Sequence, residues 1–139
     1  MQIKTDSIKI STRGHTDIID ITREVETVLK NSGLREGNLT VFISGSTAGV
    51  TTIEYEPGLL KDLPEAFEKI ASTGVTYHHD ATWGDGNGYA HVRAALLGAS
   101  FIVPFKNGKL LLGTWQQIVV VDFDNRPRRR SVVVQMMGQ

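Results

Sequence analysis

The chain has 139 residues, no cysteine, and equal numbers of basic and acidic residues, so its formal net charge is zero. The length is typical of one domain, and we expect a single domain over residues 1–139. The composition excludes disulfides, a thiolate nucleophile and a cysteine-based zinc site, and it argues against a general polyanion-binding protein. No apolar run reaches the ~20 residues of a membrane span and the N-terminus lacks the apolar core of a signal peptide, so we expect a cytoplasmic protein.

The first half of the chain is predicted to alternate between strands and helices. Apolar residues recur at helical spacing over residues 20–31, where Gly33 follows as a stop, and again over 59–71, where Pro64 could kink or divide the helix. Strands are predicted near residues 3–10, at 39–44 and at 50–56.

The second half is predicted to hold one helix, at 87–97, followed mainly by strands. Asn107-Gly108 between two apolar runs is a strong hairpin signal. The runs "TWQQIVVVDF" and "RSVVVQMM" are typical of strands that are covered on both faces. We therefore expect an α+β fold, a mostly antiparallel β-sandwich of about seven strands with two to three flanking helices. Exposed sheet edges would favour an oligomer.

Residues 77–98 hold three of the four histidines. On a helix that starts near Asn87, His91 lies at i+4 and shares its face. His78 and His79 are expected on a short extended segment, where only one of them can point inward. These residues can also be read one by one as ordinary surface or core histidines.

Oxygen donors and glycines lie beside the histidines. Asp80 and Asp85 supply carboxylates, and the start of the helix supplies free N–H groups that favour phosphate. Together with the imidazoles they suit a divalent metal, or acid–base chemistry on a phosphorylated ligand. Gly86 and Gly88 can alternatively be there only for turn geometry.

The segment "GSTAG" follows a strand but lacks the lysine of a P-loop. Ser46 and Thr47 could hold an anion with their hydroxyl and backbone groups, or could simply form a polar turn. Glu54 and Glu56 are expected on one strand face, either solvated or gathered around a metal or cationic ligand.

Two further candidates lie near the C-terminus. Trp115, beside Gln116, is either a core residue or a flat wall for an aromatic ring. In "RPRRR", Arg126, Arg128 and Arg130 share a face if extended, and could recognise phosphate, bridge subunits or be solvated. The short patch and zero net charge argue against a nucleic-acid partner.

The C-terminal third carries a family resemblance. The run "HVRAALLGASFIVPF", then "NGKLLLGTWQQIVVVDFD" and "RPRRRSVVVQMMG", resembles the YjbQ-like family, whose members are assigned a secondary thiamine-phosphate synthase activity. Upstream, "STRGHTDIIDIT" and "STAGVTTIEYEPG" also resemble that family, so the match covers nearly the whole chain.

The resemblance implies a helix-flanked β-sandwich assembled as a homotrimer. It also implies a transferase that joins a hydroxymethylpyrimidine diphosphate to a thiazole phosphate and releases diphosphate. The family's polar positions fall on these residues of this chain: Glu54, His79, Asn87, His91, Trp115 and Gln116. We accordingly expect catalytic roles for Glu54, His79, Asn87 and His91, and substrate contacts from Ser46, Thr47, Asp85, Gly86, Trp115, Gln116, Arg128 and Arg130.

One position departs from the family. Gly45 stands where many members have a histidine, and the arginine turn is one residue longer than usual. If three histidines hold a metal in those relatives, His79 and His91 remain as metal ligands for Mg²⁺ or Zn²⁺ here. A carboxylate such as Glu54 or Asp85 would complete the shell, or the metal is absent. The alternative to an enzyme is thus a non-catalytic trimeric binder of a phosphorylated metabolite or divalent metal.

Overall fold

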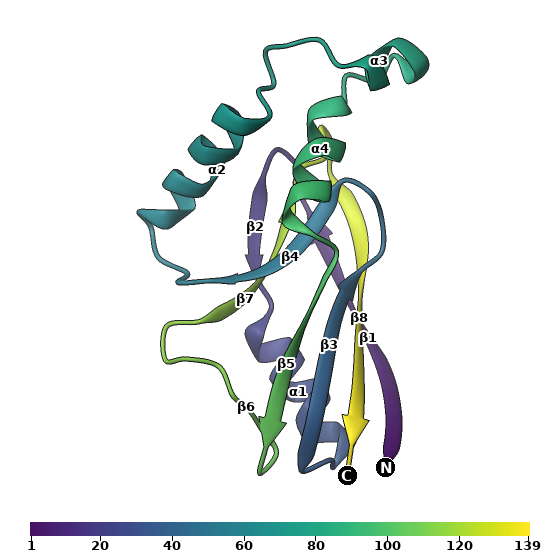
Figure 1. Cartoon of the computed structure of the whole chain (residues 1–139), viewed down its shortest axis with the longest axis vertical. Coiled ribbons are helices and arrows are strands. Elements are labelled where there is room, and N and C mark those ends of the chain that lie inside the picture. Colours follow the sequence, from purple (N-terminus) through teal and green to yellow (C-terminus); the bar gives the residue numbers. More distant parts are fainter.

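The expected α+β class with antiparallel sheets is confirmed by a computed structural model that describes residues 1–139 (Figure 1). The strands are β1 (Gln2–Thr12), β2 (Asp17–Asp20), β3 (Glu36–Ile43), β4 (Ala48–Ile53), β5 (Ser100–Lys106), β6 (Lys109–Leu110), β7 (Gln117–Asp122) and β8 (Arg128–Gly138). The helices are α1 (Thr22–Ser32), α2 (Leu59–Ile70), α3 (His78–Trp83) and α4 (Gly88–Leu97). None of them is long and apolar enough to span a membrane.

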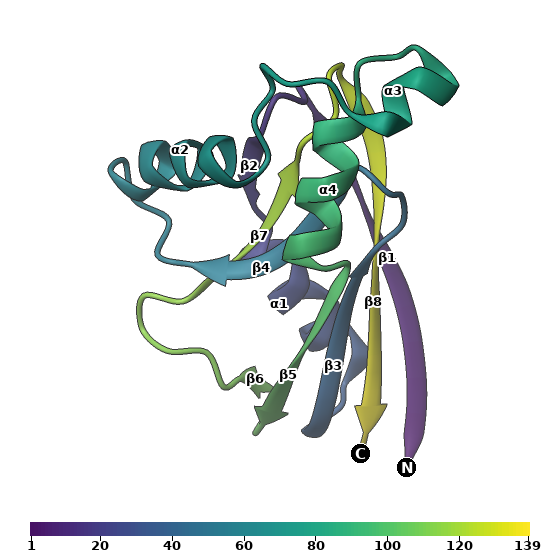
Figure 2. The ribbon, with the colours of Figure 1, turned by 45° about the horizontal axis from the view of Figure 1, so that its top comes forward.

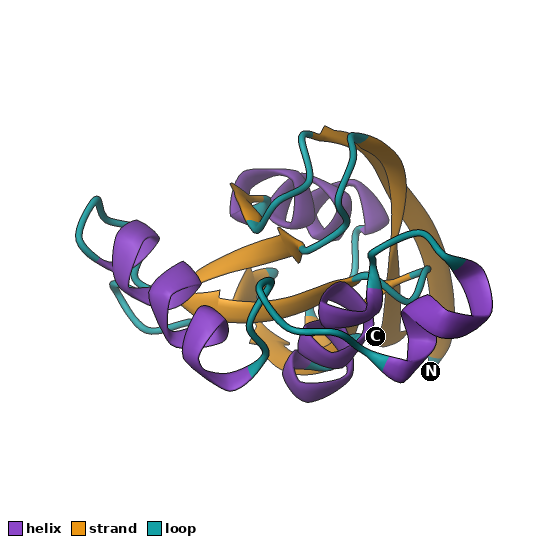
Figure 3. Cartoon of the chain, turned by 90° about the horizontal axis from the view of Figure 1, so that it is seen from above, coloured by secondary structure: helices purple, strands orange, loops and turns teal.

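The strands form two sheets. The larger has the order β1-β8-β3-β5-β6 and the smaller β2-β7-β4, and every pairing is antiparallel. Apolar side chains from both sheets and from α1 form the main core. A second core lies on the other face of the smaller sheet, where α2 and α4 cover it (Figure 2). Viewed from above, helices therefore lie on either side of the strands (Figure 3).

This layering explains why the two long apolar runs differ. Val119 and Val121 of β7 face the second core while Ile118 and Val120 face the main core, so the strand is buried on both faces as predicted. The same prediction is wrong for β8, in which only alternate residues are buried and Met137 is exposed. The reason is that no helix covers the outer face of the larger sheet.

Most helix ends and turns lie where local sequence patterns predicted them. Helix α1 ends at Gly33, which adopts the left-handed conformation, and α2 continues through Pro64 as one helix. Asn107 and Gly108 both have positive φ, as a tight hairpin between β5 and β6 requires. The expected extended segment at His78 and His79 is wrong, because these residues begin the short helix α3.

Candidate functional site

The side chains of His79, on α3, and His91, on α4, lie against each other. Their ring centroids are 4.1 Å apart and the ring planes are inclined by 36°. Helix α3 positions His79 and ends at Gly84, whose left-handed φ of 64° turns the chain back toward α4. A Cβ on Gly88 would lie 2.5 Å from the Cβ of Tyr77, so a glycine is needed where the two helices begin side by side.

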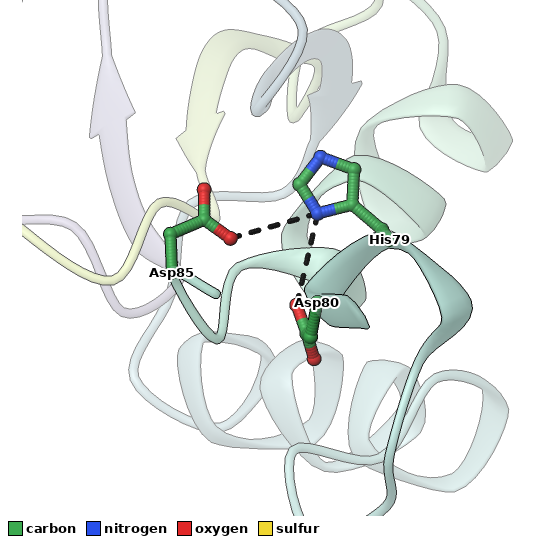
Figure 4. A group of neighbouring side chains, drawn as sticks. All are labelled: His79, Asp80 and Asp85. Atoms are coloured by element: carbon green, nitrogen blue, oxygen red, sulfur yellow. Dashed lines mark ion pairs between the residues drawn. The ribbon is translucent and has the colours of Figure 1, made fainter. Parts of the chain in front are cut away.

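Two carboxylates face the same edge of the His79 ring (Figure 4). Nδ1 of His79 lies 3.6 Å from Oδ1 of Asp80 and 3.6 Å from Oδ1 of Asp85. Both distances are too long for hydrogen bonds. The nitrogen is buried and has no hydrogen-bond partner, which is unusual for a buried polar atom.

The backbone at the start of α4 orients both carboxylates. The Gly88 N–H donates to Oδ1 of Asp80 at 2.9 Å, and the Asn87 N–H donates to Oδ1 of Asp85 at 3.2 Å. Asn125, from the turn before β8, donates its side-chain amide to the Asp85 carbonyl and its N–H to Oδ1 of Asn87. The loop is therefore held on two sides, and the predicted residues Asp85 and Asn87 lie beside the histidine pair.

The environment of His91 favours the neutral imidazole. Burial lowers the pKa of His91, and the neighbouring His79 lowers it further, against the opposing effect of Asp85, Asp124 and Asp80. At neutral pH this ring has a free lone pair. It can act as a base, accept a hydrogen bond or ligate a metal.

The donors around His79 fit a divalent cation. Two ligands of a tetrahedral ion with bonds of about 2.0–2.2 Å lie about 3.3–3.6 Å apart, close to the observed separations. The three ligand atoms of His79, Asp80 and Asp85 all lie within 4.8 Å of one another. An imidazole with two carboxylates suits Zn²⁺ or Mn²⁺, and Mg²⁺ would use mainly the carboxylates.

His91 also lines a hollow of about 460 Å³. One wall is the loop before β4, with Gly45 and Ser46, and the other is the small-residue face of α4. Ser46 is exposed and its hydroxyl is free to meet a ligand there. Thr47 is buried instead, and its hydroxyl donates to Oδ2 of Asp124 at 2.8 Å, so it is not free to contact a ligand.

A buried ion network lies under this loop. Asp122 and Asp124 are fully buried; Arg130 contacts Oδ2 of Asp122 at 2.8 Å and Oδ1 at 3.0 Å, and Arg128 contacts Asp124 at 2.9 Å. Burial alone would raise the pKa of Asp124, but hydrogen bonds from Thr47 and Arg128 outweigh it and the pKa is lowered. The two arginines predicted to contact substrate thus form ion pairs within the chain.

Sequence reasoning missed the acidic half of this network. A signal for it was present, because Asp122 and Asp124 alternate with apolar residues in "VVVDFDN" and so share one side of an otherwise apolar strand end. Two carboxylates placed there need cationic partners. The arginine turn that follows supplies them.

The remaining predicted residues lie elsewhere in the chain. Ala48 pairs with Asp122 at the histidine end of the smaller sheet, whereas Ile53 pairs with Gln117 at its other end, about 17 Å away. Glu54, Trp115 and Gln116 lie beyond that far end. Trp115 is 73% exposed, and Gln116 donates to the Thr52 hydroxyl.

The expected shared strand face of Glu54 and Glu56 is wrong, because β4 ends at Ile53. Glu56 instead accepts hydrogen bonds from the N–H groups of Gly58 and Leu59 at the start of α2. Its role is local, since a carboxylate there satisfies N–H groups that have no partner in the helix.

Comparison with known proteins gives consistent matches over the whole chain. Residues 6–139 match the family model described as "UPF0047 protein YjbQ-like". A UPF0047 protein of Archaeoglobus fulgidus is 40% identical over 94% of this chain and 98% of its own length. A UPF0047 protein of Methanothermobacter thermautotrophicus is 38% identical over all of this chain and 95% of its own.

Solved structures agree with the sequence matches. A YbjQ-like protein of unknown function from Sulfolobus solfataricus superimposes with a TM-score of 0.94 and 32% identity over 99% of both chains. An uncharacterised YjbQ/UPF0047 protein of Clostridium acetobutylicum gives a TM-score of 0.87 and 34% identity over 95% of this chain and 99% of its own. By sequence and by fold, this chain belongs to the YjbQ-like UPF0047 family.

Proposed function

We propose that the chain is a transferase of the thiamine-phosphate synthase type that works at the His79–His91 pair. The observation that carries the proposal is the unpartnered Nδ1 of His79, buried opposite two carboxylates and next to an imidazole whose pKa is lowered. Such perturbed, convergent groups beside a hollow are typical of functional sites.

The reaction replaces one bond by another at a single carbon. The thiazole nitrogen forms a C–N bond with the methylene carbon of the hydroxymethylpyrimidine diphosphate, and the C–O bond to diphosphate breaks. The electron pair leaves with the diphosphate, so the site must stabilise negative charge on the leaving group. A divalent cation held by His79, Asp80 and Asp85 would supply that charge stabilisation.

The chain's own residues would bind and orient the two substrates. The Ser46 hydroxyl is suited to phosphate oxygens. The start of α4 is not free for phosphate as the sequence predicted, because the N–H groups of Asn87 and Gly88 already donate to Asp85 and Asp80. Neutral His91 would accept a hydrogen bond from the pyrimidine or move its proton. Thr47, Arg128 and Arg130 would act indirectly, by holding the loop that carries Ser46.

We also propose that the working form is a homotrimer. Glu54, Trp115 and Gln116 lie at the far end of the smaller sheet, so within one chain they cannot meet a ligand bound at His91. They could complete the site of a neighbouring copy. Trp115 is well placed for this because its side chain is largely exposed.

The test is direct turnover. Purified protein given both substrates and Mg²⁺ should form thiamine phosphate, detected by mass spectrometry, and His91→Ala should abolish the product. His78→Ala is the matched control, since His78 is the exposed neighbour of His79 and forms no ion pair with Asp80 or Asp85. Ligand binding without product would favour the non-catalytic binder. The observation that supports this alternative is Gly45, which stands where many family members have a histidine.

A further inference from the structure

A second hollow lies on the outer face of the larger sheet, at the end nearest the arginine turn. Its volume is about 450 Å³. It is lined by Lys9, Ile10 and Ser11 of β1 and by Arg129, Arg130 and Ser131 of β8. The lining residues include three basic residues, two serines and no acidic residue.

Strand register explains how these groups converge. Lys9 pairs with Ser131 and Ser11 pairs with Arg129, so these four side chains share the uncovered face. Arg130 belongs to the opposite face, where its Nε and Nη2 are held by Asp122 and Thr47. Its Nη1 makes none of these bonds and points toward Gly45, where a Cβ would lie only 2.6 Å from it.

The charges of Lys9 and Arg129 are uncompensated. Neither side chain forms an ion pair, and the Lys9 ammonium donates only to the Ser131 hydroxyl at 3.0 Å. The two residues are diagonal neighbours on adjacent strands, about 7–8 Å apart, where like charges repel each other. An anion between them would remove that repulsion and gain charge-assisted hydrogen bonds.

We propose that Lys9, Ser11, Arg129 and Ser131 form a binding site for a phosphate group. A tetrahedral dianion has oxygens for the ammonium, the guanidinium fork and both hydroxyls at once, whereas a planar carboxylate has only two. The volume leaves room for a phosphorylated metabolite rather than the phosphate group alone. The site shares no lining residue with the hollow beside His91.

The test is a titration of the full chain with inorganic phosphate at low ionic strength, followed by amide chemical shifts. We expect saturable shifts at Ser11 and Ser131, and at least tenfold weaker binding in K9Q/R129Q. The matched control is K61Q/K69Q, which removes the same charge from exposed positions on α2, and it should bind as the wild type does. His91→Ala should also leave these shifts unchanged.

A second probe, glycerol phosphate, distinguishes free phosphate from a phosphate ester. Equal affinity would mean that only the phosphoryl group is recognised, and tighter binding of the ester would mean that the rest of the hollow takes part; both support the site. Loss of binding in K61Q/K69Q to the same extent as in K9Q/R129Q would overturn it. So would unchanged binding in K9Q/R129Q, or no saturable shift at Ser11 and Ser131 in the wild type.

Discussion

Asp122→Asn tests whether the buried ion network supports the loop beside His91. Asp122 is fully buried and accepts two hydrogen bonds from Arg130, one from the Thr12 hydroxyl at 2.6 Å and one from the Asp124 N–H at 3.1 Å. Asparagine has nearly the same shape, so the substitution leaves no cavity. It removes the charge and turns one acceptor oxygen toward Arg130 into a donor.

The expected cost follows from the charge that is left behind. Arg130 has a side chain only 9% exposed, and its nearest remaining carboxylate is Asp124 at 3.8 Å. Breaking a buried ion pair by removing one partner typically costs about 3–5 kcal/mol. With an unfolding entropy of about 2.1 cal/mol/K per residue, this corresponds to a fall in Tm of roughly 10–17 °C.

Thermal and urea unfolding measure this change. Asp62→Asn, on the exposed side of α2, removes the same charge without touching a buried partner and should change stability by less than about 0.5 kcal/mol. D122N/R130M should recover part of the loss, because it removes the unpaired cation as well. A cost below about 1 kcal/mol for D122N, or no recovery in the double variant, would refute the reasoning.

Three further predictions concern the site itself. The folded-state pKa of His91 lies below its unfolded value near 6.5, so the unfolded state binds more protons, and this contribution to stability is lost as pH falls from about 6.5 through the folded pKa. With chelator present, the urea midpoints at pH 5 and pH 7.5 should therefore differ less in His91→Gln than in the wild type. An unchanged difference would contradict the assignment. Gly45→Ala should cost about 1–3 kcal/mol by urea unfolding and more than Gly84→Ala, since both have positive φ but only Gly45 has a neighbour, Arg130, in the way; equal costs would contradict this. Trp115→Ala should leave Tm within a few degrees but lower kcat/KM at least tenfold if Trp115 completes a neighbour's site, and unchanged kinetics would rule that role out.

Much of the fold could be predicted from local patterns. The spacing of apolar residues indicated α1, α2 and α4, and Asn107-Gly108 indicated the β5–β6 hairpin. Whether a strand is covered on one face or two depends on which helix packs there, which is tertiary information. This is why Val119 and Val121 followed the prediction while Met137 did not.

The site was predictable where its residues are close in sequence. His79, Asp85, Asn87 and His91 lie within 13 residues, and two short helices bring them together. The missed carboxylates of Asp122 and Asp124, at the end of β7, form ion pairs with Arg130 and Arg128 of β8. Because β7 and β8 belong to different sheets, these pairs depend on how the two sheets pack. Glu54 and Trp115 were predicted as site residues only from the family resemblance. No local pattern tells whether they belong to the site of the same chain or to that of another copy.

The central claim is that His79, Asp80, Asp85 and His91 form one working site. It is tested most directly by calorimetric titration of the chelator-treated protein with Zn²⁺ at pH 7.5. We expect one ion per chain in the wild type, at least tenfold weaker binding in His79→Gln and in Asp85→Asn, and unchanged binding in His78→Gln. Absence of binding in the wild type, or equal binding in His79→Gln, would contradict the claim.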